Sequence, residues 1–170
     1  MSTGERKSAI GLDIGTTHIK ACLTDENGIV LAVSETDNEM KETAGFGKCF
    51  VPEELFDKAV SCIRQVAKSG VCAIGITSMA EAGVFLDETG RPVLPVIPWN
   101  GDGGECLLPE DLRGEALYNR TGLIWHPKYT VNRILDLRRK RPELYRKICC
   151  FLSVSDYILY RLTGVMATDE

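Results

Sequence analysis

The sequence predicts an α/β protein with a mixed sheet, in which antiparallel N-terminal strands are flanked by helices. Two short apolar runs, 8–13 and 19–24, stand on either side of a Gly-Thr-Thr turn, and an Asn-Gly pair then leads into a third run. Asn-Gly between apolar runs is a strong hairpin signal, because both central residues must tolerate positive φ. From Glu53 onward the apolar residues recur every three or four positions, which is typical of one face of a helix.

The remaining elements follow in order along the chain. Pro52 suits the first turn of the helix, which we expect to end near Gly70. Residues 71–77, VCAIGIT, form a nearly continuous apolar run that is typical of a buried strand reached by a crossover. A second turn is expected at 88–91, and the three prolines that follow favour an extended loop. Four helical segments are predicted: 110–120, 130–140, a short one after Pro142, and one from Val154 that Ser153 caps and Gly164 ends.

Composition and charge limit the classes of function. No stretch approaches the roughly 20 apolar residues needed to span a bilayer. The net charge of −4 argues against a nucleic-acid surface. The basic run 138–141 does not require such a surface, because cations are favoured near a helix C-terminus. Seven scattered cysteines without a Cys-x-x-Cys pair support neither a disulfide framework nor a zinc site. We expect a cytoplasmic protein of one domain, with reduced thiols and with neither a nucleic-acid nor a membrane partner.

The stretch IGLDIGTTHIK near the N-terminus contains a candidate site for phosphate and Mg²⁺. A strand that ends in Asp13 and turns at once through Gly15 places a carboxylate at the sheet edge, beside exposed backbone N–H groups. Glycine lets a phosphate approach the backbone, Thr16 and Thr17 add hydroxyl donors, and Asp13 can hold Mg²⁺ directly or through water. The alternation of the second strand lets Lys20 point toward the same phosphate. On these residues alone, a plain turn with a capping aspartate is the alternative.

Segments along nearly the whole chain from Ile10 resemble the FGGY carbohydrate kinases, members of the superfamily that includes actin, hexokinases and heat-shock chaperone ATPases. GLDIGTTHIKACLTDENGIVLA resembles the opening of these kinases, and AIGITSMAEAGVFLDETGRPVLPVIPWN resembles their second strand pair and Trp-containing substrate loop. TGLIWHPKYTVNRILDLRRKRPELYRKICCFLSVSDYILYRLTG resembles their helical stretch, with its T-G-x-x-x-x-P segment, Pro-Glu-Leu turn and final Leu-Thr-Gly. The resemblance implies a ribonuclease H-like (actin-like ATPase) fold. The cysteine-rich zinc signature of repressor-related kinases is absent from the sequence.

The resemblance implies roles for the residues of the N-terminal turn. Asp13 would be the carboxylate linked to Mg²⁺ and Lys20 the basic contact to the γ-phosphate of ATP. Gly15, Thr16 and Thr17 would form the phosphate turn. ATP and Mg²⁺ are therefore the implied cofactors, which agrees with the chemistry expected from the residues themselves.

The resemblance also implies a group of substrate residues. Ser78, Met79 and Glu81 fall in the loop with which the family binds its substrate, and a carboxylate at Glu81 can accept two hydroxyl hydrogen bonds, as a polyol requires. Ala80 stands where glycerol kinases carry an arginine. Trp99 lies where the family packs an aromatic ring against the carbon chain of the sugar, although a loop tryptophan can equally belong to the core.

Two further positions carry an expectation with an open alternative. The family usually has Trp-x-Asp, whereas this chain has Trp-Asn-Gly-Asp, so the register of Asp102 in the substrate loop is open. Lys128 stands where glycerol kinases place a substrate-contacting tyrosine, and a lysine there could meet a hydroxyl or an acidic group of the substrate. A solvated lysine is the alternative.

The activity implied by the resemblance is ATP-dependent phosphorylation of a hydroxyl on a small-molecule carbohydrate or polyol. The family's catalytic base is an aspartate further downstream, and its members are much longer. We therefore expect residues 1–170 to be part of an N-terminal, sugar-binding, actin-like domain, without the rest of that domain or the ATP-binding C-terminal domain. Alone they should be inactive, and they should self-associate through apolar surface on residues 71–77 or the helices after residue 110. The alternative is a non-catalytic actin-like binding or regulatory module.

Overall fold

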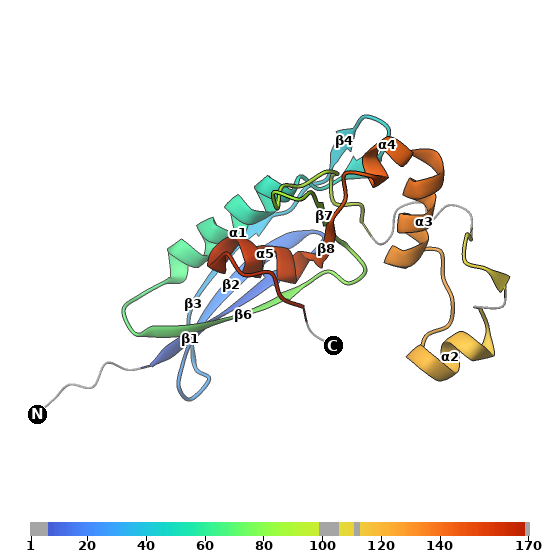
Figure 1. Cartoon of the computed structure of the whole chain (residues 1–170). Coiled ribbons are helices and arrows are strands. Elements are labelled where there is room, and N and C mark those ends of the chain that lie inside the picture. Colours follow the sequence, from blue (N-terminus) through green and yellow to red (C-terminus); the bar gives the residue numbers. More distant parts are fainter. Residues whose placement is uncertain (1–6, 99–105, 111–112, 169–170) are drawn as a thin grey trace, which may run out of the picture.

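The computed structural model of the chain describes residues 7–98, 106–110 and 113–168. At its centre is a four-stranded sheet in the order β3-β2-β1-β6 (Figure 1). β1 pairs antiparallel with β2, and β2 with β3, whereas β6 is parallel to β1. The predicted mixed sheet with antiparallel N-terminal strands is thereby confirmed. Its strands are β1 (Ser8–Ile14), β2 (His18–Asp25), β3 (Val30–Asp37) and β6 (Val71–Ser78).

The hairpin between β2 and β3 forms at the Asn-Gly pair, as predicted. Gly28 has a φ of 80°, a conformation that glycine adopts without steric cost. The carboxylate of Asp25 accepts hydrogen bonds from the backbone N–H groups of Asn27 and Ile29, both at 2.9 Å. These bonds close the turn from within, so the hairpin is specified by residues adjacent in sequence.

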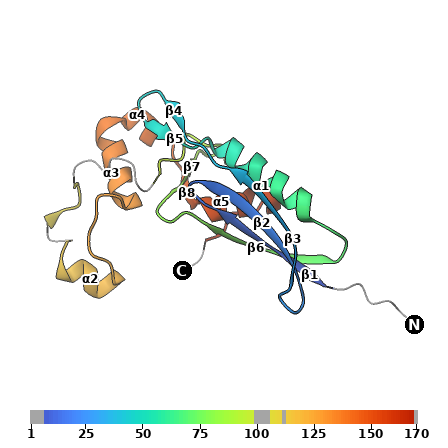
Figure 2. The same cartoon turned by 180° about the vertical axis from the view of Figure 1, so that it is seen from behind.

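Helix α1 (Pro52–Val66) connects the antiparallel strands to β6 and packs on one face of the sheet. Its apolar stripe is at most 1% exposed, and burial of Leu55 and Val66 contributes about 1.5–3 kcal/mol each. The helix ends at Val66 rather than near Gly70, because Ala67 is already extended with a ψ of 134°. Figure 2 shows the opposite face of the sheet without a covering helix. The buried stripe consists of Leu55, Ala59, Cys62 and Val66.

Strand β6 forms where the apolar run predicted a strand, but the expectation that it is buried is wrong for this chain. Residues 72–75 are all exposed, and Ile74 retains 39% of its accessible surface. The reason is position, since β6 is an edge strand with β1 as its neighbour in the sheet. An apolar run thus indicates a strand that favours burial, but its actual burial depends on which elements pack beside it.

Two small two-stranded sheets complete the fold, and neither pairing was predicted, although the turn expected at 88–91 forms after residue 86, where the N–H of Asp87 donates to the carbonyl of Arg91 at 2.9 Å. β4 (Lys41–Thr43) pairs with β5 (Gly47–Cys49) just before α1. β7 (Gly83–Leu86) pairs antiparallel with β8 (Cys150–Ser153), which joins segments far apart in the sequence. All four strands are only three or four residues long, so their alternation gives almost no sequence signal.

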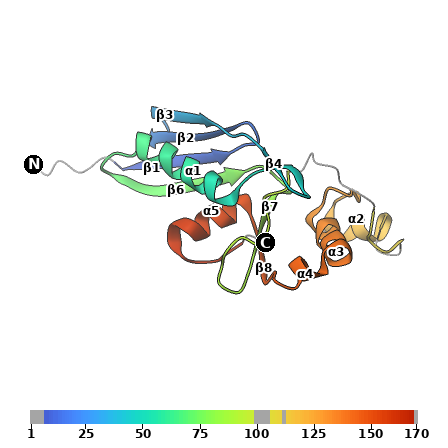
Figure 3. The same cartoon turned by 90° about the horizontal axis from the view of Figure 1, so that it is seen from above.

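Helix α5 (Val154–Thr163) follows β8 directly and lies beside α1 on the same side of the sheet (Figure 3). The hydroxyl of Ser153 accepts a hydrogen bond from the backbone N–H of Asp156 at 3.1 Å. Gly164 ends the helix in the left-handed conformation, with a φ of 76°. Both predicted caps are confirmed.

The other helices lie beyond the β7–β8 sheet, on the side away from the N-terminus (Figure 1). α3 (Thr130–Lys140) has the predicted bounds, and α4 (Pro142–Tyr145) begins at the expected proline. α2 (Glu115–Thr121) begins later than expected, after Gly114, whose φ of 68° is incompatible with a helix. No helix in the described ranges has the length and apolar character that crossing a bilayer requires.

Removing the cap of α5 should measurably destabilise the chain. We expect Ser153→Ala to lower the free energy of unfolding by about 1 kcal/mol, because the N–H of Asp156 loses its acceptor. Urea unfolding followed by circular dichroism measures the change. Ser61→Ala, at an exposed position within α1, is the matched control and should cost almost nothing. Equal losses in both variants would contradict the capping role.

Candidate functional site

The candidate site lies where two parallel strands end. β1 and β6 run in the same direction, and their final residues, Ile14 and Ser78, are register partners. Their carboxyl ends therefore meet at one edge of the sheet, which is where ligands bind in α/β proteins. Asp13 faces Lys20 across the β1–β2 pair and Thr77 across the β1–β6 pair. Pairing thus brings residues from three strands to the same edge.

Asp13 projects from the bare face of the sheet. Its neighbours Leu12 and Ile14 point into the core, and the alternation leaves Asp13 exposed. In the part of the chain that the structure describes, no ion pair or side-chain hydrogen bond engages this carboxylate. A single accessible carboxylate suits Mg²⁺, which usually binds through one or two carboxylates, water and substrate phosphate. No cluster of three or more metal-ligating side chains occurs among these residues.

The turn after β1 presents backbone donors. The N–H of Gly15 donates to the carbonyl of His18 at 2.9 Å, and a Cβ on Gly15 would lie only 3.0 Å from that oxygen. Glycine therefore permits the close turn. Within the described ranges, no hydrogen bond uses the backbone N–H of Thr16 or Thr17. Two adjacent free N–H groups are what an anion-binding turn requires.

Lys20 lies on the same bare face but is paired within the sheet. Its ammonium nitrogen is 3.3 Å from a carboxylate oxygen of Glu35 on β3. His18 Nε2 lies 3.5 Å from the other oxygen of Glu35 and 3.6 Å from Asp37. Both members of the Lys20–Glu35 pair are well exposed, and such pairs contribute at most about 1 kcal/mol. An incoming phosphate can therefore compete for Lys20 at little cost.

Ser78 and Met79 serve the fold in this structure. The hydroxyl of Ser78 accepts a hydrogen bond at 3.1 Å from the backbone N–H of Ser155, in the first turn of α5. Met79 is 8% exposed and belongs to the main core, while its N–H donates to the carbonyl of Ile14 at 2.9 Å. These contacts fix the direction in which the chain leaves β6 toward Glu81.

Glu81 lines a hollow of about 210 Å³. It has a φ of 58°, and among the described residues it is the one non-glycine residue with positive φ. Such a conformation costs of order 1 kcal/mol and is concentrated at functional sites. Aromatic rings of Trp125 and Tyr129 form the wall, at 6.0 Å between ring centroids. An adjoining hollow of about 330 Å³ shares Trp125. The hollow thus has apolar walls, and Glu81 lies at its border.

Arg133 on α3 ties this region together. Its guanidinium donates to the carbonyl of Pro98 at 2.7 Å and to that of Lys128 at 3.4 Å. Burial lowers the pKa of the guanidinium, and the negative charge of Glu81 acts in the opposite direction. Arg133 therefore connects α3 to the segment that leads to the predicted substrate loop.

The remaining predicted residues divide into two groups. Trp99 and Asp102 lie outside the described residues. Lys128 lies beside the aromatic wall, with its ammonium nitrogen 5.9 Å from the centroid of the Tyr129 ring. The structure thus gathers Asp13, Lys20 and the turn at one edge, and it places Glu81 at the hollow near α2, with Lys128 next to Tyr129 of its wall.

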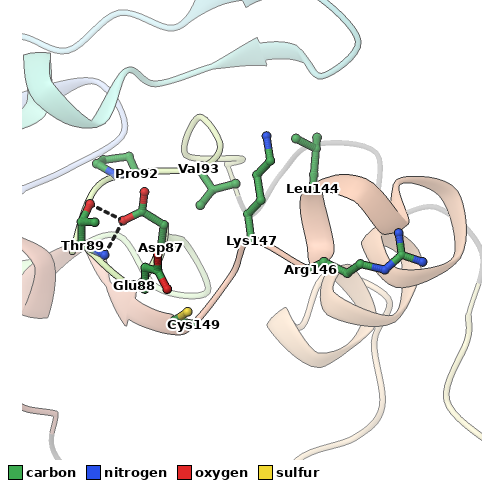
Figure 4. Close-up of a pocket in the computed structure, with 9 residues that line it drawn as sticks. All are labelled: Asp87, Glu88, Thr89, Pro92, Val93, Leu144, Arg146, Lys147 and Cys149. Atoms are coloured by element: carbon green, nitrogen blue, oxygen red, sulfur yellow. Dashed lines mark hydrogen bonds between the residues drawn. The ribbon is translucent and has the colours of Figure 1, made fainter.

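A larger hollow, of about 530 Å³, lies at the far end of β7 from Glu81 (Figure 4). Asp87 and Glu88 of the turn after β7 lie on one side of it and Arg146 and Lys147 on the other, with the Arg146 side chain pointing away from the acidic residues. A backbone bond from Arg91 and the hydroxyl of Thr89 hold the pKa of Asp87 below its ordinary value. These bonds close the turn, so the charges there have a structural explanation.

Three residues that shape the site were not predicted from the sequence. Trp125 stands in the quoted segment TGLIWHPK, and its aromatic character was the available signal. Arg133 sits in a helix rich in basic residues, so nothing distinguished it. Asn38 follows β3 in a polar stretch that suggests a solvated loop, although its side chain is 4% exposed.

Known proteins resemble the chain along almost its whole length. It is 27% identical to the gluconokinase of Bacillus subtilis over 94% of this chain and 33% of the relative. It is 31% identical to the xylulose kinase of Escherichia coli over 94% of this chain and 34% of the relative. It is 30% identical to the glycerol kinase of Aquifex aeolicus over 91% of this chain and 34% of the relative. The chain therefore spans about a third of the length of the curated relatives it matches.

Solved structures share the fold. Gluconate kinase from Lactobacillus acidophilus superposes with a TM-score of 0.83 at 24% identity, over 95% of this chain and 34% of that one. Xylulose kinase from Rhodospirillum rubrum superposes with a TM-score of 0.82 at 24% identity, over 96% of this chain and 36% of that one. The expected actin-like ATPase fold is confirmed by these neighbours. The model of the FGGY family of carbohydrate kinases, N-terminal domain, matches residues 8–170. The chain belongs to the FGGY family of carbohydrate kinases.

Proposed function

We propose that this chain supplies the phosphate turn and the sugar-binding surface of an ATP-dependent kinase that phosphorylates a hydroxyl of a sugar or polyol. One observation carries the proposal: the accessible Asp13 carboxylate stands beside two free backbone N–H groups, at the edge where β1 and β6 end. In a member of a carbohydrate kinase family, this arrangement supports binding of a metal-linked polyphosphate.

The residues at the sheet edge would share the work of binding the transferred phosphate. Asp13 would hold Mg²⁺, which when bound supplies positive charge to the phosphate oxygens. Thr16 and Thr17 would donate hydrogen bonds from their backbone N–H groups to the phosphate. Lys20 would leave its ion pair with Glu35 and contact the phosphate instead. Phosphoryl transfer depends mainly on positioning and charge neutralisation, which are the functions these groups can provide. We place the catalytic base outside these 170 residues and expect them to be inactive alone.

The hollow beside Glu81 would bind the acceptor. Relatives of this chain are named for gluconate, xylulose and glycerol, all of which carry adjacent hydroxyl groups on a short carbon chain. Glu81 can accept two hydroxyl hydrogen bonds, and Trp125 offers an apolar face to the carbon chain. Lys128, Ser78, Met79, Trp99 and Asp102 remain proposed substrate residues, although the Ser78 hydroxyl and the Met79 side chain have structural partners. We also propose a cytoplasmic location, consistent with seven free cysteines.

Loss of Asp13 should remove catalysis and spare sugar binding. In the natural protein that carries this chain, we expect Asp13→Ala to lower kcat about 10²–10³-fold, because charge on the transferred phosphate is no longer stabilised. The KM for the sugar should change less than about twofold. Coupled ADP-release assays measure both. Asp57→Ala removes the same charge from exposed α1, across the sheet, and should leave kcat unchanged. Wild-type turnover of Asp13→Ala would refute the phosphate-turn assignment.

Glu81 offers a test that separates strain from binding. Glu81→Gly should raise the free energy of unfolding by up to about 1 kcal/mol, because glycine tolerates a φ of 58°. It should also weaken sugar binding by about 1–3 kcal/mol, since the sugar hydroxyls lose their acceptor. Glu81→Ala should weaken binding equally without the gain in stability. Urea unfolding and the KM for the sugar are the measurements. An unchanged KM in both variants would remove Glu81 from the site.

Self-association of the 170 residues is a further proposal, supported by the exposed apolar surface of edge strand β6. Light scattering of the purified chain should show a mass above that of one copy. Ile74→Lys should reduce the association, because it places a charge on that edge. Val33→Lys, on the opposite edge strand β3, should not. A wild-type chain that stays strictly monomeric at high concentration would contradict this proposal.

A further inference from the structure

Asn38 makes two hydrogen bonds to the turn that follows β1. Its side-chain Nδ2 donates to the carbonyl of Gly15 at 2.7 Å. Its backbone N–H donates to the carbonyl of Thr17 at 2.8 Å. One residue, placed directly after β3, thus holds carbonyls at both ends of the turn. It is also buried, at 4% exposure, although the residues on either side of it are exposed.

The side-chain bond to Gly15 determines which way the N–H of Thr16 faces. In a trans peptide the C=O and the following N–H point in opposite directions. Because the Gly15 carbonyl is held toward Asn38, the N–H of Thr16 points away from Asn38. The described residues leave the N–H groups of Thr16 and Thr17 without an acceptor. The N–H of Thr16 is therefore held in one direction and available to an anion, and the N–H of Thr17 beside it is also free to bind one.

The amide orientation of Asn38 follows from its partner. If the amide were reversed, Oδ1 would face the Gly15 carbonyl, acceptor against acceptor. With Nδ2 on that carbonyl, Oδ1 is buried and meets no donor among the described residues. An apolar side chain would fill the same space without leaving a buried acceptor unpaired. Pairing of β2 with β3 needs only the backbone N–H of this residue, so the side chain serves the turn.

We propose that Asn38 is a positioning residue for the phosphate turn, which its side-chain amide fixes with the N–H group of Thr16 directed toward bound phosphate. This inference rests on the proposed function of that turn. It predicts that the Nδ2 donor affects affinity for a polyphosphate and leaves the sugar-binding hollow unaffected. Asn38 contacts neither the hollow nor the reacting atoms, so its effect on activity is indirect.

The experiment compares variants of the natural protein that carries this chain, labelled with ¹⁵N at threonine, titrated with Mg-ATP and followed through the amide ¹H–¹⁵N signals of Thr16 and Thr17. The wild type should show saturable shifts at these two amides. Asn38→Leu removes the donor while filling the space, and it should weaken binding about tenfold. Ser34→Ala is the matched control, because Ser34 is also a buried polar residue of this hairpin and bonds to Gln65. It should bind Mg-ATP as the wild type does.

A pH profile of Asn38→Asp separates positioning from general destabilisation. A buried carboxyl group has a raised pKa and, while protonated, can donate to the Gly15 carbonyl in place of Nδ2. Affinity relative to wild type at the same pH should therefore be nearly preserved at pH 5 and fall about tenfold or more by pH 8. The affinity of Asn38→Leu for Mg-ATP, relative to wild type at the same pH, should not change with pH. A merely structural role would predict no such difference between the two variants.

The outcomes distinguish this inference from the function on which it rests. Absence of shifts at Thr16 and Thr17 in the wild type would overturn the phosphate turn and this inference together. Wild-type binding that Asn38→Leu and Asn38→Asp retain at every pH would overturn only the role of Asn38. If Asn38→Leu fails to fold by circular dichroism, the pH profile of Asn38→Asp decides the matter, and a flat ratio refutes the proposal.

Discussion

The division of strand β1 between two faces of the sheet determines where the candidate site lies. Ile10, Leu12 and Ile14 are at most 1% exposed and pack beneath α1. Because side chains alternate, the residues between them must face the other side, and Asp13 is one of these. A shift of one residue in the pairing would bury Asp13 and expose the core. The apolar packing that stabilises the sheet therefore also keeps the carboxylate accessible to ligand.

Two unfavourable features are found near this edge, and a further one, the buried Ser8 hydroxyl without a partner among the described residues, lies at the other end of β1. Glu81 keeps a positive φ that glycine would tolerate better, and Asn38 keeps a buried oxygen without a donor. Each feature is unfavourable by about 1 kcal/mol or more. Elsewhere the chain uses glycine at positive φ, as in the turns at Gly28 and Gly90. Such concentration of unfavourable features is characteristic of functional sites.

Local features were predictable from the sequence, whereas contacts between distant segments were not. The Asn-Gly hairpin, the Ser153 cap and the start of α4 each depend on residues within one turn of the chain. The β7–β8 pair, the exposure of β6 and the burial of Asn38 depend on which distant segment lies alongside. For the site, the pattern located Asp13 and its turn, while Trp125 and Arg133 acquire their places only through α2 and α3 packing. Trp99 and Asp102 remain predictions.

The parallel pairing of β1 with β6 has a consequence for the order of folding. Residues of the turn after β1 and the hairpins around it are neighbours in sequence, so they can form early. Ile14 and Ser78 are partners only after the intervening strands and α1 have closed a long loop. Contacts of large sequence separation carry a loop-closure entropy and slow folding. We infer that the phosphate turn forms before β6 pairs with β1 and positions Glu81. The two parts of the site therefore form at different stages of folding.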